Sequence, residues 1–340
     1  VKSLEELIEM KKINELKVTV LTGSDNPRER TRKLFSISSG QAKIVIGTHA
    51  LFQKKVHFNN LRLAVIDEQH KFGVMQRFRL EKKGDVNSII MSATPIPRSL
   101  ALTVFGDRDL TIIKEKPKNR LGIQTFVISR KKIKQLLHKL GKQMSKGQQV
   151  YWVCPLIEEA ENITLSNSND RFAYLKKEFS EFKVGLIHGQ MSSEDKECEL
   201  KKYKDREVDI LVSTTVIEVG IDNPNATVIV IENANRFGLS QLHQLRGRVG
   251  RGSKKSYCFL MYDGNLSDQA IQRLKTMRET QDGFEIAERD MALRGSGDLL
   301  GTMQSGHKIF KLSEVVEEPE LFLEANKLVQ DTETLTSKLS

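Results

Sequence analysis

The sequence contains little of what usually stabilises secreted proteins or anchors proteins in membranes. Only three cysteines occur among its 340 residues, and they lack the C-x-x-C spacing of a zinc site and the pattern of a disulfide framework. No apolar run approaches the length of a membrane span, and the first residues show no signal-peptide pattern. These absences argue against a secreted or membrane protein, so we expect a cytoplasmic chain.

The overall composition is that of an ordinary globular protein with an excess of positive charge. Hydrophobic residues make up 39% of the chain and charged residues 29%, which leaves enough apolar sequence for two cores. At roughly 100–200 residues per domain, this length predicts two domains. The net charge of +10 and the isoelectric point near 9.3 favour a polyanionic partner.

Apolar runs alternate with helix-forming sequence in the first hundred residues. Four runs predict strands, and residues 26–38 predict a helix with Pro27 in its first turn. Such alternation is typical of a parallel sheet covered on both faces. The predicted strands are residues 17–22, 43–47, 61–67 and 88–91.

The pattern restarts after the charged, proline-containing segment 114–121, which we interpret as a linker. Apolar residues from Ile133 to Met144 recur at helical spacing and predict a helix. Residues 157–170 are rich in acidic residues, Asn and Ser, and predict a loop. The remaining elements predicted here are strands at residues 123–128, 149–155, 183–188, 208–213, 227–232 and 257–262, and helices at residues 171–182 and 193–205.

Two adjacent acids, Asp67 and Glu68, stand at the carboxyl end of a predicted buried strand. Ligands of open α/β sheets bind just beyond such ends. An Asp there can hold Mg²⁺ through water, and a neighbouring Glu can orient the water that attacks a phosphate. Two solvated acids that cap a strand are the commoner interpretation of Asp-Glu alone. His70 and the motifs further along the chain favour the metal interpretation.

Ser92 and Thr94 follow the next predicted strand, again at its carboxyl end. Their hydroxyl groups can hydrogen-bond to the acidic pair and relay the state of a nucleotide to the other half of the protein. A Ser-Ala-Thr sequence is usually only a turn. The assignment therefore depends on its place one strand after Asp67 and Glu68.

An eleven-residue run from Gln241 to Arg251 interleaves arginines with glycines. Arg246, Arg248 and Arg251 can stabilise charge that develops on a transferring phosphoryl group, and the glycines allow close approach of the backbone. A basic surface loop is the alternative. The length of the run favours the phosphate interpretation.

Threonines end several predicted strands at positions where a phosphate can bind. Hydroxyl and backbone N–H groups at such positions bind phosphates, although Thr is also a common helix cap. In the same region as the last of them, Asp222 can contact a ribose hydroxyl. The residues are Thr22 with the adjacent Gly23, Thr48, and Thr214.

In this order, the motifs resemble those of superfamily 2 helicases, and their wording is most similar to the RecG-like branch-migration DNA helicases. Residues 67–74 (DEQHKFGV), 92–98 (SATPIPR) and 236–244 (RFGLSQLHQ) carry this resemblance. Residues 282–306 resemble the translocation motif that this family shares with transcription-repair coupling factors. In that motif a helical hairpin and a loop couple closure of the motor to movement of duplex DNA.

The resemblance implies an α/β fold with two RecA-like parallel-sheet lobes, the first incomplete, followed by a helical translocation hairpin and a C-terminal helix. The implied boundaries are residues 1–115 for a partial ATP-binding lobe, 116–262 for the second lobe, 263–310 for the translocation motif and 311–340 for the tail.

The resemblance also implies an ATP-dependent DNA helicase that uses ATP and Mg²⁺ and acts on branched or duplex DNA. Asp67 would hold Mg²⁺, and Glu68 would activate water. Arg248 and Arg251 would reach the γ-phosphate. The residues implied in nucleotide binding are Asp222 and Gln244; those in DNA binding are Thr22, Gly23, Thr48, Thr214, Arg294 and Gln304; those in coupling are His70, Ser92 and Thr94.

Three departures from the family pattern affect these expectations. No phosphate loop of the form G-x-x-x-x-G-K-[ST] occurs in the chain, and the family's wedge domain is absent. Met303 and Ser296 replace a usual arginine and proline in the translocation loop. We therefore expect a fragment, from a truncated gene, a split gene or a trimmed expression product, that does not hydrolyse ATP alone.

A separate N-terminal fragment that supplies the phosphate loop and the wedge domain would then be a further partner. An incomplete first sheet would also expose apolar edges and faces. Two alternatives remain open at this point: a catalytically inactive DNA-binding remnant, and the motor of a transcription-repair coupling factor.

Overall fold

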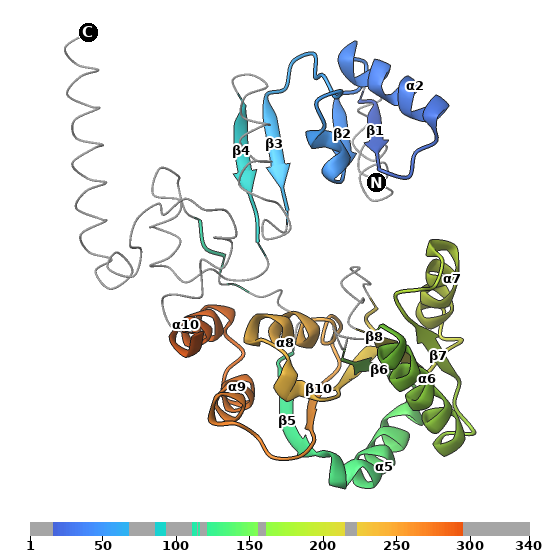
Figure 1. Cartoon of the computed structure of the whole chain (residues 1–340), viewed down its shortest axis with the longest axis vertical. Coiled ribbons are helices and arrows are strands. Elements are labelled where there is room, and N and C mark those ends of the chain that lie inside the picture. Colours follow the sequence, from blue (N-terminus) through green and yellow to red (C-terminus); the bar gives the residue numbers. More distant parts are fainter. Residues whose placement is uncertain are drawn as a thin grey trace, which may run out of the picture. The chain divides into compact units, whose positions relative to one another are not determined.

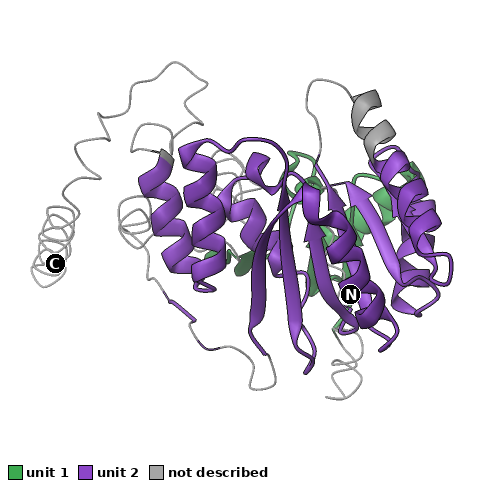
Figure 2. Ribbon diagram, turned by 90° about the horizontal axis from the view of Figure 1, so that it is seen from below, with its two compact units in different colours: residues 1–93 green, residues 94–340 purple. Residues whose placement is uncertain are grey.

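The computed structural model describes residues 16–67, 86–92, 111–113, 115, 121–155, 161–214 and 223–294, with backbone alone for residues 161–167 and 294. The chain divides into two compact units, residues 1–93 and 94–340 (Figure 2). The predicted division into four parts stays a prediction. Most of the predicted linker, and all residues after 294, lie outside the described part of the chain.

The first unit contains two pairs of parallel strands (Figure 1). Strand β1 pairs with β2 and strand β3 pairs with β4, as the continuous apolar runs predicted. Helix α2 connects β1 to β2, and the short 3-10 helix η1 follows β2. The bounds are β1 Val18–Leu21, α2 Pro27–Ser38, β2 Ile44–Gly47, η1 His49–Phe52, β3 Leu63–Ile66 and β4 Asn87–Ile90.

Helix α2 begins and ends where local chemistry stops or starts it. The Asn26 side chain accepts a hydrogen bond from the Glu29 N–H, and Pro27 occupies the first turn, where its missing N–H costs nothing. Gly40 then takes a left-handed conformation with φ of +74°. The buried face of the helix packs Ile37 against Leu21 of β1.

One face of the β3–β4 pair is apolar and exposed. The register pairs Val65 with Ile89, so alternate residues from both strands share this face. Leu63, Val65, Ile89 and Met91 are 52%, 55%, 50% and 43% exposed. Parallel sheets are normally covered on both faces, so this exposure agrees with the prediction of an incomplete first sheet.

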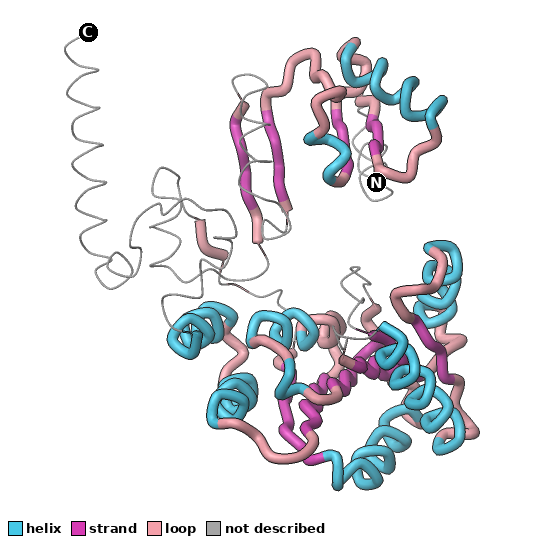
Figure 3. The backbone as a smooth tube through the Cα atoms, viewed as in Figure 1, coloured by secondary structure: helices cyan, strands magenta, loops and turns pink. Residues whose placement is uncertain are grey.

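The second unit is built on a six-stranded parallel sheet with the strand order β5-β10-β9-β6-β8-β7 (Figure 3). Helices lie on both of its faces. The strands are β5 Ile123–Ser129, β6 Gln149–Cys154, β7 Val184–Ile187, β8 Ile210–Thr214, β9 Ala226–Ile231 and β10 Ser256–Tyr262. The helices are η3 Arg130–Lys132, α5 Ile133–Met144, α6 Glu161–Glu178, α7 Ser193–Lys204, η4 Ala234–Arg236, α8 Leu239–Arg246, α9 Asp268–Glu279 and α10 Gly283–Arg294.

Alternate residues of each strand enter two separate cores, because successive side chains of a strand point to opposite faces. Trp152 lies in the core that α5 and α6 cover. Tyr151 lies in the core that α7, α8, α9 and α10 cover. The second unit therefore has three layers, with α5 and α6 on one side of the sheet and α8 to α10 on the other.

One sequence prediction in this unit is wrong. The predicted loop 157–170 is helical from residue 161, because α6 extends from Glu161 to Glu178. The Asn and Ser residues of this segment have modest helix propensity, which is a weak prior that tertiary packing overrides. Leu175 and Phe179, which are buried in the core, anchor its last turns. No helix in the described part of the chain is long and apolar enough to cross a membrane.

Candidate nucleotide and DNA sites

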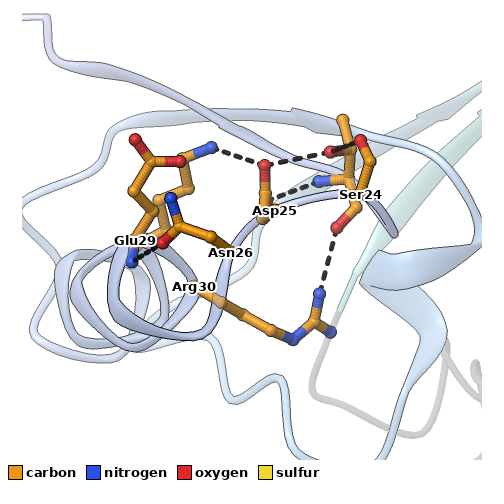
Figure 4. A network of polar contacts seen from close by, with 7 residues as sticks. Ser24, Asp25, Asn26, Glu29 and Arg30 are labelled. Atoms are coloured by element: carbon orange, nitrogen blue, oxygen red, sulfur yellow. Dashed lines mark hydrogen bonds and ion pairs between the residues drawn. The ribbon is translucent and has the colours of Figure 1, made fainter. Parts of the chain in front are cut away.

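The loop after β1 is organised around the carboxylate of Asp25 (Figure 4). Asp25 accepts hydrogen bonds from the Thr22 N–H at 2.8 Å and from the Thr22 hydroxyl at 2.9 Å. Lys33 of α2 lies 2.8 Å from the same carboxylate. The hydrogen bond from Lys33, and then that from the Thr22 N–H, lowers the pKa of Asp25 to about 2. The loop is therefore held by an ionised carboxylate at neutral pH.

Thr22 is fully engaged within this loop. Its carbonyl oxygen accepts a hydrogen bond from Arg30 Nη1 at 3.0 Å, in addition to the two bonds that it donates to Asp25. A phosphate contact that uses the Thr22 hydroxyl as donor requires its bond to Asp25 to open. Gly23 is exposed, and a Cβ at its position would meet nothing within 4 Å.

Thr48 lies beside Thr22 at the same sheet edge. The register pairs Leu21 with Gly47, so the next residue of each strand emerges at neighbouring carboxyl ends. A Cβ on Gly47 would lie 2.4 Å from the Leu21 carbonyl oxygen, so only glycine fits there. Thr48 is exposed, and its side chain makes no capping bond to η1. The structure thus brings together two of the residues predicted to bind DNA.

Asp67 and Ser92 also share a sheet edge. Asp67 follows the last residue of β3, and the Met91 N–H donates to the Ile66 carbonyl at 2.8 Å, which continues the ladder beyond β4. Both Asp67 and Ser92 are exposed. Glu68, His70 and Thr94 lie outside the described residues. Within the described part, no group of three or more His, Cys, Asp or Glu side chains could hold a metal ion.

In the second unit, Thr214 is the last residue of β8 and pairs in register with Cys154 of β6. It is 2% exposed, and its hydroxyl has no hydrogen-bond partner among the described atoms. A buried, unpaired hydroxyl costs free energy, which is consistent with a group that awaits a ligand. Asp222 and Gln304 lie outside the described residues, and only the backbone of Arg294 is described.

Helix α8 carries the first part of the predicted arginine run. The Gln241 side chain accepts a hydrogen bond from the Gly238 N–H at 3.2 Å and so caps the start of the helix. Leu239 and Leu242 are completely buried against the sheet. Gln244 is half-buried and does not join this leucine face.

The loop after α8 presents Arg248 and Arg251 around two glycines. Gly250 has φ of +74°, and a Cβ there would lie 2.9 Å from Ile123 Cγ1 of β5. A Cβ on Gly252 would lie 2.9 Å from the Pro224 carbonyl oxygen. These close approaches fold the loop tightly against the lobe. Arg248 is half-buried and Arg251 is exposed, as residues that reach a phosphate need to be.

Arg246 belongs to the same run but has a different place. It is 2% exposed, and its Nη1 donates to the carbonyl oxygens of Met277 at 2.9 Å and Thr280 at 2.8 Å. Burial lowers the pKa of its guanidinium from the ordinary value. Arg246 therefore does not reach a phosphate as the sequence predicted. Its position four residues after Leu242, on the buried side of α8, was the signal that could have shown this.

Two further bonds attach α9 and the following turn to the lobe. Arg273 donates to the carbonyl oxygens of Phe237 at 3.2 Å and Asn235 at 3.3 Å. The Gln281 side chain accepts from the Ile123 N–H at 3.0 Å. The predicted hairpin thus begins as two helices, α9 and α10, that are fixed to the element that carries Arg248.

A crevice that the sequence did not reveal opens beyond the carboxyl ends of β6 and β9. These neighbouring strands continue to helices on opposite faces, which defines a topological switch point, where open α/β sheets bind ligands. The cavity has a volume of about 490 Å³. Its lining residues are Arg130, Ile133, Cys154, Pro155, Asp170, Arg171, Tyr174, Glu232 and Asn233.

A buried ion pair forms one wall of this crevice. Arg171 binds Glu232 through both nitrogens that face it, and the indole N–H of Trp152 donates to the same carboxylate. The guanidinium lies between the rings of Trp152 and Tyr174, 5.5 Å and 5.2 Å from their centroids. Burial raises the pKa of the Cys154 thiol. No sequence signal links Arg171 to Glu232, which lie on different elements.

Three families match successive parts of the chain. Residues 1–103 match the DEAD/DEAH box helicases, and residues 130–253 match the helicase conserved C-terminal domain. Residues 280–333 match the C-terminal part of domain 3 of the ATP-dependent DNA helicase RecG.

Curated relatives agree with these matches. The chain is 48% identical to an ATP-dependent DNA helicase RecG of Synechocystis sp. over 93% of this chain and 38% of that protein. It is 45% identical to the RecG of Thermotoga maritima over 92% of this chain and 40% of that protein. The chain therefore spans less than half the length of these relatives.

Solved structures match the fold. A structure of RecG bound to a three-way DNA junction superimposes with a TM-score of 0.69 and 40% identity, over 94% of this chain and 41% of that chain. Yeast Dbp5 bound to RNA and ADP BeF3 shares the fold alone, at 13% identity and a TM-score of 0.58 over 86% of this chain and 77% of that chain. The fold is the predicted α/β arrangement with two RecA-like lobes and C-terminal helices. The chain belongs to the RecG family of ATP-dependent DNA helicases and corresponds to its motor region.

Proposed function

We propose that this chain is the motor of a helicase that uses ATP to move branched DNA, in fork reversal or junction migration during recombination and repair. The RecG relatives, and the RecG structure that holds a three-way junction, support this substrate. The match of residues 280–333 to RecG domain 3 favours this reading over the motor of a transcription-repair coupling factor.

One observation carries the proposal. Arg248 and Arg251 follow α8, and Arg246 at the end of the same helix holds the carbonyl groups of Met277 and Thr280. A shift of the loop on contact with a γ-phosphate is therefore passed to α9 and α10 by direct hydrogen bonds. The state of the nucleotide and the position of the hairpin are linked through one helix.

The nucleotide chemistry is assigned to few residues. Arg248 and Arg251 stabilise negative charge on the γ-phosphate, Gln244 and Asp222 help to bind the nucleotide, and Glu68 orients water. Asp67 has an exposed carboxylate at a strand end, which fits a ligand that holds Mg²⁺ through water. When bound, Mg²⁺ would offset the negative charge of the triphosphate. Thr94, Ser92 and His70 would relay the outcome between lobes.

The DNA contacts are assigned to the strand ends and the translocation motif. Thr48, Gly23 and Thr22 would follow the backbone on the first unit, and Thr214 on the second. Arg294 and Gln304 would belong to the translocation loop. The paired positions of Thr22 and Thr48 at one sheet edge support this assignment.

A second candidate function follows from the missing phosphate loop. The 340 residues contain no G-x-x-x-x-G-K-[ST] sequence, whose lysine and backbone N–H groups hold the phosphates in such enzymes. We propose that these residues by themselves bind DNA without turnover. ATP hydrolysis then depends on a phosphate loop supplied by further sequence or by a separate N-terminal fragment.

The test is ATP hydrolysis with and without a three-way DNA junction. It compares the 340-residue chain alone with the chain joined to the phosphate-loop portion of the Synechocystis relative. We expect no turnover by the chain alone, and DNA-stimulated turnover by the joined protein that Glu68→Gln abolishes. Turnover by the chain alone would refute the dependence on the loop. No turnover by the joined protein would refute the motor function.

A further inference from the structure

The polar face of α5 is far more basic than any function described above requires. Residues 130–146 contain Arg130 and six lysines and no Asp or Glu. All six lysines are exposed, whereas Leu136, Leu137, Leu140 and Met144 on the opposite side are buried in the core. The lysines are Lys131, Lys132, Lys134, Lys139, Lys142 and Lys146. We name this surface the α5 lysine face.

The lysines have no acidic partners within the described residues. Arg130 pairs with Asp263 at 2.9 Å, but no ion pair involves the lysines there. Helix α7 shows the ordinary alternative, with Glu194 and Asp195 in its first turn and an ion pair of 2.6 Å between Lys202 and Glu199. The excess charge is therefore a property of α5 and not of the surface in general.

This arrangement works against the stability of the helix. Lys131 and Lys132 stand at the start of α5, where the macrodipole favours acids, and its first turn contains none. Lys139, Lys142 and Lys146 follow one another at spacings of three and four residues, where like charges repel. Folding does not explain such a face, whereas a bound polyanion does.

The position of α5 separates it from the nucleotide side of the lobe. Helices α5 and α6 cover one face of the sheet, and α8, α9 and α10 cover the other (Figure 1). DNA that lies along α5 is therefore a different segment from DNA that α10 and the sequence after it act on. A branched DNA provides such a second segment in one molecule.

We propose that the α5 lysine face binds the phosphate backbone of a second duplex arm of branched DNA. The inference rests on the proposed function, because the partner is taken to be DNA. Helix α5 has 12 residues and is about 18 Å long. Duplex DNA offers about one phosphate charge per 1.7 Å of its axis, so several phosphates lie within reach of its lysines.

The test compares two variants of the joined protein with equal loss of charge. The test variant carries Lys131→Gln, Lys134→Gln, Lys139→Gln and Lys142→Gln. The control carries Lys177→Gln, Lys183→Gln, Lys201→Gln and Lys204→Gln, exposed lysines whose sequence neighbours include Glu178, Glu181 and Glu199. Fluorescence anisotropy measures binding to a three-way junction and to a linear duplex over a range of salt concentrations, and thermal unfolding checks the fold.

We expect the test variant to bind the junction about tenfold or more weakly than the control does. Its salt slope should fall by as much as about 3.6, at about 0.9 per phosphate contact. Binding to the linear duplex should change much less, and the melting temperature should hold or rise because repulsion is relieved. Equal effects in both variants, or equal losses on junction and duplex, would overturn the inference. A protein that binds neither DNA at low salt would overturn the proposed function as well.

Discussion

The guanidinium of Arg246, the last residue of α8, donates a hydrogen bond of 2.8 Å to the carbonyl oxygen of Thr280, the residue that ends α9. A second bond of 2.9 Å reaches Met277. Two residues further along, Arg248 stands in the loop where the sequence predicts contact with a γ-phosphate. One short segment therefore contains both the structural link to the hairpin and the group assigned to the nucleotide.

Arg246→Met should destabilise the second unit, and Arg248→Met should not. The first change leaves buried carbonyl groups without a donor, which costs about 1–3 kcal/mol. Thermal unfolding should show a drop of about 2–4 °C for each kcal/mol. Arg248→Met should leave the melting temperature nearly unchanged but abolish ATP turnover of the joined protein. Equal melting temperatures for the two variants would contradict the structural role of Arg246.

Gly250→Ala should destabilise the chain more than Gly147→Ala does. Both glycines have positive φ, +74° and +72°, so both changes strain the backbone. Only at Gly250 does the new Cβ also meet a neighbour, Ile123 Cγ1 at 2.9 Å, whereas Gly147 has nothing within 4 Å. We expect a cost of about 1 kcal/mol at Gly147 and clearly more at Gly250. Chemical denaturation measures both, and identical costs would show that the clash is relieved.

The stability of the first unit should decline in acid because of Asp25. Its pKa falls from 3.8 to about 2 on folding, chiefly through Lys33 and the Thr22 N–H. A depressed carboxyl pKa gives stability that is present above the unfolded value and is lost as the pH falls through the folded value. Asp25→Asn should therefore lower stability at pH 7 and flatten its decline between pH 4 and pH 2. An unchanged pH profile in this variant would contradict the assignment.

The Arg171–Glu232 pair should behave as a unit. Removing one partner leaves an uncompensated buried charge, which costs about 3–5 kcal/mol. We expect large losses of stability for Arg171→Met and for Glu232→Gln, and a smaller loss for the double variant than the sum of the two. Trp152, the single tryptophan of the chain, donates to Glu232, so its fluorescence follows unfolding at this site. Additive losses would show that the pair is not coupled.

The strands were predictable because each is a continuous apolar run that enters a parallel sheet, as β6 and β9 show by complete burial. Residues 161–170 were not, because polar sequence there forms the start of α6. The run Arg246–Arg251 predicted a phosphate site from residue types, but only the structure separates Arg246 from Arg248. The crevice could not be predicted, because its lining comes from strand ends that the topology alone brings together.

The most direct test of the motor function is ATP-driven unwinding of a three-way DNA junction by the joined protein, beside its Glu68→Gln variant. We expect the unaltered protein to unwind the junction, and the variant to bind the same DNA without unwinding it. Unwinding by the variant at the rate of the unaltered protein, or hydrolysis of ATP by the unaltered protein without any movement of DNA, would contradict the proposal that this chain is an ATP-driven DNA motor.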